Sequence, residues 1–240
     1  MKKNGKSATS IATLFLVVVI LVCTNVMPLE TSATLNFRLG SNVIAAGAYH
    51  TAYVCADGTV DAFGRSKDGR LKTEKWKDIE AIAAESHTIG LKSDGTVVAV
   101  GNNKYNQCNV EKWKNIVDVA AGERNTIGAK SDGSVCVAGD NKYKQKQTDN
   151  WKHIVAVAMG SKTAYGLTVD GTVKAAGSNA SGQKNVSSWE NIVSISAGNS
   201  HVVGLKSNGT VLAAGSNTQG ECDVTEWEIL LPLLQVPAIR

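Results

Sequence analysis

Three of the four histidines occupy one recurring position and are the first candidates for chemistry. His50, His87 and His201 each stand seven residues before an Asp-Gly or Asn-Gly dipeptide. Histidines in register could hold a metal ion or act as general bases. No carboxylate recurs beside them, however, and two further copies of the position hold Asn125 and Thr163. We therefore expect no metal site and expect each histidine to tie the loops of its own unit by hydrogen bonds.

Four other residues stand out because they do not recur in every unit. Tyr105 and Tyr143 follow Lys104 and Lys142 directly. Irregular residues on a regular scaffold are where binding specificity usually lies, so these four are the predicted ligand-binding residues of a loop face. A solvated basic surface is the alternative. It applies equally to a basic stretch in the first unit, which holds Arg65, Lys67, Arg70, Lys72 and Lys75.

The sequence contains none of the common catalytic signatures. Gly-x-Ser-x-Gly, His-Glu-x-x-His and Gly-x-x-x-x-Gly-Lys are all missing. Cysteines follow no metal-binding spacing and are expected to be isolated, partly buried thiols: Cys55, Cys108, Cys136 and Cys222. We therefore expect no enzyme activity and no cofactor.

The elements that position these residues come from an internal repeat. All five tryptophans recur at intervals of 37 or 38 residues, at Trp76, Trp113, Trp151, Trp189 and Trp227. An Asp-Gly or Asn-Gly dipeptide and an isolated glycine keep the same period. The tryptophans could stack on sugars, but such regular spacing is more typical of core packing between units. A period of this length is typical of solenoids, propellers or arrays.

Each unit is predicted to contain four β-strands. In the second unit these cover residues 79–84, 87–92, 96–100 and 107–110, with a tight Asp-Gly turn between the second and third. One small sheet cannot bury both of its faces alone and must stack on its neighbours. Radial stacking of such sheets predicts an all-β, β-propeller fold built from five repeats of about 38 residues.

The repeats resemble those of the regulator of chromosome condensation family, in the short form of bacterial proteins. The motifs are Ala-Ala-Gly, His-Thr, Leu-Lys-Ser-Asp-Gly-Thr-Val, Ala-x-Gly-x-Asn and Gln-Cys-Asn-Val-x-x-Trp, and they cover residues 41–227. The resemblance implies a propeller, which in this family has seven blades, whereas five units are present here. The family prototype exchanges the nucleotide of a small GTPase and docks on nucleosomes. The wedge that touches the GTPase has no counterpart here, so that activity is not carried over.

The first 33 residues have the layout of a secretory signal peptide. Three lysines precede the apolar run Ile11–Cys23, and small residues at Thr31 and Ala33 suit cleavage after Ala33. An uncleaved anchor is the alternative, because the stretch from Ala8 to Met27 reaches about 20 residues, the length that spans a bilayer. Residues 34–40 then form a linker. The predicted location is secreted, or membrane-anchored outside the cytoplasm.

Charge and the end of the sequence bear on partners. Residues 34–240 hold 22 basic and 20 acidic side chains, so no nucleic acid is expected as a partner. The apolar tail, residues 228–240, departs from the repeat and is either a cap on the last unit or the mark of an array cut short. If the five units form an open ring, exposed sheet faces and edges favour self-association.

These observations favour a binding protein without catalytic activity. The leading hypothesis is an exported or membrane-anchored propeller that binds a protein or a cell-envelope polysaccharide through its loop face. One alternative, by family resemblance only, is nucleotide exchange or chromatin binding. The other is a truncated remnant of a longer repeat protein.

Overall fold

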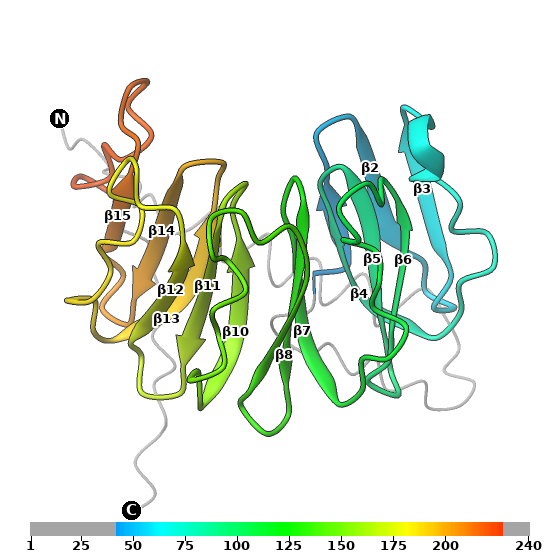
Figure 1. The fold of residues 1–240 in the computed structure, drawn as a ribbon, viewed down its shortest axis with the longest axis horizontal. Helices are drawn as coiled ribbons and strands as arrows, with labels where there is room; N and C mark the ends of the chain where they lie inside the picture. Colours follow the sequence, from blue (N-terminus) through cyan, green and yellow to red (C-terminus); the bar gives the residue numbers. More distant parts are fainter. Residues whose placement is uncertain (1–41, 228–240) are drawn as a thin grey trace, which may run out of the picture. The chain divides into compact units, whose positions relative to one another are not determined.

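The computed structural model describes residues 42–227, which form fifteen β-strands and one short 3-10 helix, η1 (Lys67–Gly69) (Figure 1). The strands make five sheets, each of three consecutive antiparallel strands in chain order. All described residues belong to one compact unit. Sheet by sheet, the strands are β1 (Ile44–Ala46), β2 (His50–Val54), β3 (Val60–Gly64); β4 (Ile79–Ala84), β5 (His87–Lys92), β6 (Val97–Gly101); β7 (Ile116–Ala121), β8 (Asn125–Lys130), β9 (Val135–Gly139); β10 (Ile154–Met159), β11 (Thr163–Thr168), β12 (Val173–Gly177); β13 (Ile192–Ala197), β14 (His201–Lys206), β15 (Val211–Gly215).

The predictions for the two ends of the chain concern residues that the structure does not describe. The targeting segment 1–33, the linker 34–40 and the tail 228–240 lie outside the described residues. Within residues 42–227, no helix has the length and apolar character that crossing a membrane requires.

The turn between the second and third strands of each sheet is fixed by its Asp-Gly or Asn-Gly dipeptide. In the second sheet, Asp94 Oδ1 accepts hydrogen bonds from the backbone N–H (2.8 Å) and the hydroxyl (2.6 Å) of Thr96. Gly95 adopts φ +75°, which glycine reaches without strain. The Gly95 carbonyl then accepts a hydrogen bond (3.0 Å) from the N–H of Ile116, where the third sheet begins. Each of the first four turns therefore closes its own hairpin and fixes the start of the next sheet.

The fourth strand predicted for each unit does not form, and that prediction is wrong. At residues 107–110 the chain makes successive turns around Asn103 instead. The Asn103 side chain accepts a hydrogen bond from the Cys108 N–H (2.9 Å) and donates one to Asn109 Oδ1 (3.0 Å). The same pattern, around Asn217, occupies residues 222–224, where the fourth strand of the fifth unit would lie. Because asparagine satisfies these backbone groups locally, they do not pair with a sheet.

Tryptophan and glycine make the contact between neighbouring sheets. Trp76, which is 7% exposed, packs over Gly90 in β5. A Cβ added to Gly90 would lie 2.9 Å from the indole ring, so a side chain there would displace the tryptophan. The contact recurs at three further pairs: Trp113 with Gly128, Trp151 with Gly166, and Trp189 with Gly204.

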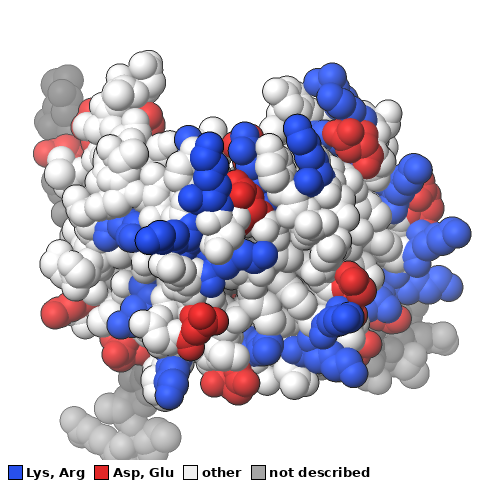
Figure 2. Space-filling model, in the orientation of Figure 1, with Lys and Arg blue, Asp and Glu red and all other residues white. Residues whose placement is uncertain are grey.

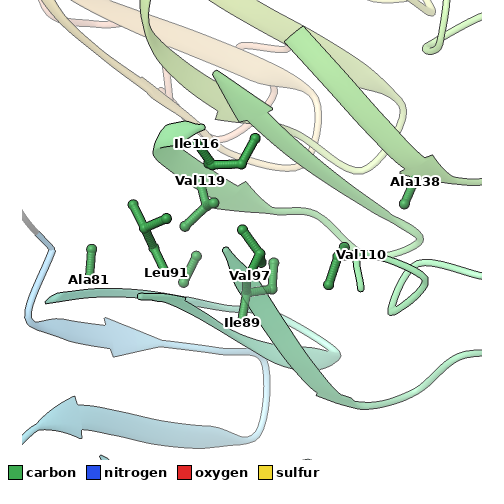
Figure 3. Packing of buried hydrophobic residues seen from close by; sticks show 9 residues of the cluster. Ala81, Ile89, Leu91, Val97, Val110, Ile116, Val119 and Ala138 are labelled. Atoms are coloured by element: carbon green, nitrogen blue, oxygen red, sulfur yellow. The ribbon is translucent and has the colours of Figure 1, made fainter. Parts of the chain in front are cut away.

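Aliphatic side chains complete the core between the sheets. In the cluster drawn in Figure 3, Ile89 and Leu91 of β5 and Val97 of β6 pack with Ile116 and Val119 of β7. Ile89 has no exposed surface and the others are at most 5% exposed. Burying side chains of this size stabilises the fold by about 1.5–3 kcal/mol each, so most of the stability comes from these seams.

The outer face of the first sheet differs from the corresponding face of every later sheet. Tyr53 occupies the place that Gly90 holds in the second sheet, and its ring stacks on Phe63 with 6.3 Å between centroids. Ile44 and Phe63 are 68% and 63% exposed. Among the described residues, nothing covers this apolar face.

Candidate ligand-binding face

A cavity of about 590 Å³ opens among the loops that join the first and second strands of the sheets. All five sheets contribute to it through corresponding loop residues: Ala48 and Tyr49, Glu85 and Ser86, Glu123 and Arg124, Ser161, and Asn199. Segments after the third strands of the first two sheets complete the lining, from Arg65 to Arg70 and from Asn102 to Tyr105. Figure 2 shows basic side chains, with acidic ones among them, bordering the hollow at the top of the view.

Arg70 is the most deeply buried charged group of the cavity, at 4% exposed. It follows η1, and its Nε donates a hydrogen bond to the Lys67 carbonyl (2.9 Å). Its Nη2 lies 3.2 Å from Asp68 Oδ2, an ion pair that fixes one side of the guanidinium. The remaining nitrogen, Nη1, has no partner. Arg70 was expected to belong to a solvated basic stretch, and its burial makes that interpretation wrong for this residue.

Glu85 faces the same cavity and is also incompletely paired. Its Oε2 is buried and accepts no hydrogen bond. Burial raises the pKa of the Glu85 carboxyl, and the neighbouring charge of Glu123 raises it further. Arg70 and Glu85 thus both line this cavity, and each has one buried polar atom without a partner.

Aromatic rings form the walls, each with a cation beside it. The Arg65 guanidinium lies 5.4 Å from the centroid of the Tyr49 ring, and that of Arg124 lies 4.7 Å from the Tyr105 centroid. Lys104 also lies over Tyr105, at 5.8 Å. These contacts hold two tyrosines at the rim in defined positions.

A family model matches four stretches of this chain. It is the regulator of chromosome condensation (RCC1) repeat, and it matches residues 43–70, 85–107, 154–183 and 192–221. These stretches include residues of the first, second, fourth and fifth sheets. The chain carries RCC1 repeats. The family expected from the sequence is thereby confirmed.

Solved structures with similar folds are RCC1-like propellers and receptor ectodomains. Prp20p from Saccharomyces cerevisiae has a TM-score of 0.58 and 21% identity, over 72% of this chain and 56% of that one. The ectodomain of the Arabidopsis thaliana receptor kinase ACR4 has 0.60 and 19%, over 73% and 69%. That of the Physcomitrella patens receptor kinase CR4 has 0.61 and 18%, over 72% and 52%. No curated protein matches, and the chain spans about half the length of Prp20p and CR4.

Two of the four predicted binding residues line the cavity of this RCC1-repeat array. Tyr105 and Lys104 belong to the lining, whereas Tyr143 and Lys142 do not. Tyr143 occupies the corresponding loop of the third unit and has Lys142 and Lys162 at 5.7 and 5.0 Å from its ring centroid. Tyr49 was not predicted from the sequence; it lies in the three-residue loop between β1 and β2, which has the same length as the corresponding loops of the third, fourth and fifth units.

Two of the repeated histidines, His50 and His87, join neighbouring RCC1 units, which corrects the expectation that they tie only their own units; His87 Nδ1 also lies 3.5 Å from the Ser86 hydroxyl of its own loop. His50 Nε2 lies 2.8 Å from the Thr88 hydroxyl of the second sheet, and His87 Nε2 lies 2.7 Å from the Thr126 hydroxyl of the third. Thr88 donates its hydrogen to the Arg70 carbonyl (2.7 Å), so His50 Nε2–H is the donor. Burial lowers the pKa of both imidazoles, that of His87 to about 4. At neutral pH both imidazoles are therefore uncharged, and each links two neighbouring sheets by a hydrogen bond beneath the loop face.

The third and fourth units have another residue at the histidine position and lack the histidine–threonine hydrogen bond. Asn125 replaces histidine in the third unit, and its Nδ2 donates to the Asp140 carbonyl (2.6 Å) of the same unit. Thr163 likewise bonds within its unit, to the Ser178 carbonyl (3.1 Å). The residues that would receive them in the next sheets are Ala164 and Val202, which offer no hydroxyl.

The other recurring positions have structural places. Trp76, Trp151 and Trp189 are buried and Trp113 is partly buried, whereas Trp227 is 58% exposed. His201 is partly buried in β14. The four described cysteines are free and partly buried. Within residues 42–227, no three His, Cys, Asp or Glu side chains gather in a way that could hold a metal ion.

Asp118, at the seam between the third and fourth sheets, was not found by sequence reasoning. Its Oδ1 accepts a hydrogen bond from the Val119 N–H (2.9 Å), and its Oδ2 accepts one from the Val157 N–H (2.8 Å) of the fourth sheet. Burial raises the pKa of the Asp118 carboxyl to about 6, although both hydrogen bonds oppose this. The corresponding positions hold Ala81, Ala156 and Ser194, so the acid is specific to the third unit.

Proposed function

We propose that this chain is a non-catalytic binding module, exported or anchored outside the cytoplasm, whose loop face binds a cell-envelope polysaccharide. The observation that carries the proposal is the cavity of about 590 Å³ to which all five sheets contribute. That volume lies within the range of ordinary ligand sites. Its lining combines tyrosine rings with hydroxyl, carboxamide, carboxylate and guanidinium groups, and these suit the hydroxyl-rich surface of a sugar.

A binding role accounts for these residues better than catalysis does. Covalent catalysis needs a nucleophile within hydrogen-bond reach of a base. The imidazoles of His50 and His87 are engaged by threonines, and the Cys108 thiol donates to the Asn102 carbonyl (3.4 Å). Burial raises the pKa of that thiol to about 11, which keeps it protonated and unreactive.

A protein partner is the second candidate, and the similar structures favour it. Prp20p was solved in a study of its binding to Gsp1p and histones, and in a second study Kap60 is bound to Prp20. Two further similar structures are ectodomains of receptor kinases. A role in nucleotide exchange or chromatin binding has only the likeness to Prp20p in its favour, and at 21% identity that likeness shows the fold alone.

The location outside the cytoplasm rests on residues 1–33 alone. Lysines, an apolar run and small residues follow one another there in the order of a signal peptide. A fusion of these residues to a reporter that is active only after export tests this part. Export of the reporter is the expected result, and retention in the cytoplasm would contradict it.

We also propose that the five RCC1 units form an open array that self-associates. A tryptophan that closed the ring would need a glycine on the first sheet, and Tyr53 holds that place. Trp227 and Phe63 are both exposed, which also favours an open array. Exposed apolar sheet faces of this kind favour association.

Binding to envelope polysaccharide tests the loop face directly. Purified protein is incubated with insoluble cell-wall polysaccharide, and the bound fraction is measured for the parent, Tyr105→Ala and Tyr143→Ala. Tyr105 lines the cavity and Tyr143 does not. Tyr105→Ala should therefore bind at least several-fold less polysaccharide, and Tyr143→Ala should bind like the parent. Equal losses in both variants, or no binding by the folded parent, would contradict the proposal.

A further inference from the structure

We infer that the cavity recognises a hydroxylated carboxylic acid, such as a uronic acid unit of an acidic polysaccharide. Arg70 binds the carboxylate and Glu85 accepts a hydrogen bond from a hydroxyl. This inference rests on the proposed function, because it names the ligand of the same loop face. It is carried by two unpaired polar groups of opposite kind that line one cavity.

Arg70 has the features of an anion-binding group. The guanidinium is held on two sides, by the Lys67 carbonyl and the Asp68 carboxylate, so its direction is set before any ligand arrives. Its Nη1 keeps its hydrogens without an acceptor, although the residue is only 4% exposed. A buried donor without a partner is costly, and a carboxylate oxygen would relieve that cost with a charge-assisted hydrogen bond.

Glu85 restricts the ligand further. No ion pair joins it to Arg70, and its Oε2 is an acceptor without a donor. A simple anion would satisfy Arg70 but leave Glu85 unpaired and repel it. A ligand that carries hydroxyl donors beside its carboxylate satisfies both groups at once. Sugar acids have this combination.

The charge balance of the cavity agrees with an acidic ligand. Five basic and three acidic side chains line it: Arg65, Lys67, Arg70, Lys104 and Arg124, against Asp68, Glu85 and Glu123. Asp68 and Glu123 are already paired, with Arg70 and Arg124. The net positive charge favours the approach of an anion and makes binding weaken as salt rises.

The ligand itself offers the cleanest test. Titration calorimetry compares trigalacturonate with its methyl ester and with a neutral trisaccharide, for the same folded protein at low salt. We expect trigalacturonate to bind at least tenfold more tightly than the other two, because only its free carboxylate can pair with Arg70. Equal binding of the ester would overturn the inference. Tighter binding of a hexaglutamate peptide would also overturn it, and would favour an acidic protein partner.

Variants of the protein separate this inference from the proposed function. Arg70→Met should lower the affinity for trigalacturonate at least tenfold. Glu85→Ala removes both the hydroxyl acceptor and the repulsion of simple anions, so it should lower the preference for trigalacturonate over acetate several-fold. Lys142→Met, outside the cavity, is the matched control. If Arg70→Met does not fold, Arg70→Lys takes its place with the same expectation. If Tyr105→Ala abolishes polysaccharide binding while folded Arg70 variants bind trigalacturonate like the parent, the loop face stands and the role of Arg70 is wrong.

Discussion

Asp118 should make this protein more sensitive to pH than its composition indicates. Its carboxyl has a pKa of about 6 in the folded chain, against an ordinary value of 3.8. Below about pH 4 the group is protonated in both the folded and the unfolded state and costs nothing. Above about pH 6 it is ionised in both, and the folded state bears the cost of a buried charge. Its contribution to stability is therefore present in acid and lost as pH rises from about 4 to 6.

The size of the effect follows from the pKa. A difference of about two units corresponds to about 3 kcal/mol, and the partial exposure of Asp118 reduces this to about 2 kcal/mol. Other groups act in the opposite direction. Burial lowers the pKa of His50 and His87, so these side chains disfavour the folded state as pH falls. The pH profile of the parent alone cannot isolate one group, and a comparison of variants can.

The assay is urea unfolding followed by tryptophan fluorescence, for the parent and Asp118→Ala, between pH 7 and pH 4.5. Alanine is the residue at this place in the second and fourth units. As pH falls, the parent should gain about 2 kcal/mol relative to the variant. Asp132→Ala is the control. Asp132 lies at an exposed turn, where hydrogen bonds from Ser134 lower its pKa below the ordinary 3.8. It is therefore ionised in the folded and unfolded states over this pH range, and the difference between the parent and Asp132→Ala should stay nearly constant. A difference between parent and Asp118→Ala that stays constant with pH would refute the reasoning.

Three further predictions concern the seams and the outer face. Trp151→Ala should lower the free energy of unfolding by about 3–5 kcal/mol in a urea titration, because it empties a buried seam; an unchanged midpoint would contradict this packing role. His87→Ala and Thr126→Val should show a coupling of about 1 kcal/mol in a double-mutant cycle, and strictly additive losses would argue against the bond between sheets. Changing Tyr53 and Phe63 together to serine should reduce the self-association seen by light scattering, and unaltered association would exclude the outer face of the first sheet as its cause.

Sequence reasoning succeeded where one residue fixes one local geometry. The strands predicted at residues 87–92 and 96–100 match β5 and, to within one residue at each end, β6, because the Asp-Gly turn and the alternating aliphatic residues determine this hairpin and its register. The predicted strand at 107–110 fails for the same kind of reason. Asn103 organises the turns around it through its own side chain, and hydrophobic alternation does not reveal such bonds.

The site was only partly predictable because it depends on contacts between units. Tyr105 and Lys104 could be found as departures from the repeat. Arg70 could not, because a charged residue after a turn is usually solvated, and only the packing of the second sheet against this loop buries it. His50 was assigned to its own unit for a related reason. The spacing of 38 residues between His50 and Thr88 gives their period but does not show that the side chains meet.

The lining of the cavity shows how a repeated fold can acquire a specific site. The loop between the first and second strands is present in all five units, yet it contributes Tyr49 in the first, Glu85 in the second and Arg124 in the third. The fourth and fifth units contribute the small polar residues Ser161 and Asn199. The residues at the seams repeat because every sheet must meet the next in the same way, and this leaves the loop positions free to differ. Charge and aromatic groups therefore gather on the side of the first three units, which is where substitutions should change ligand choice without changing the fold.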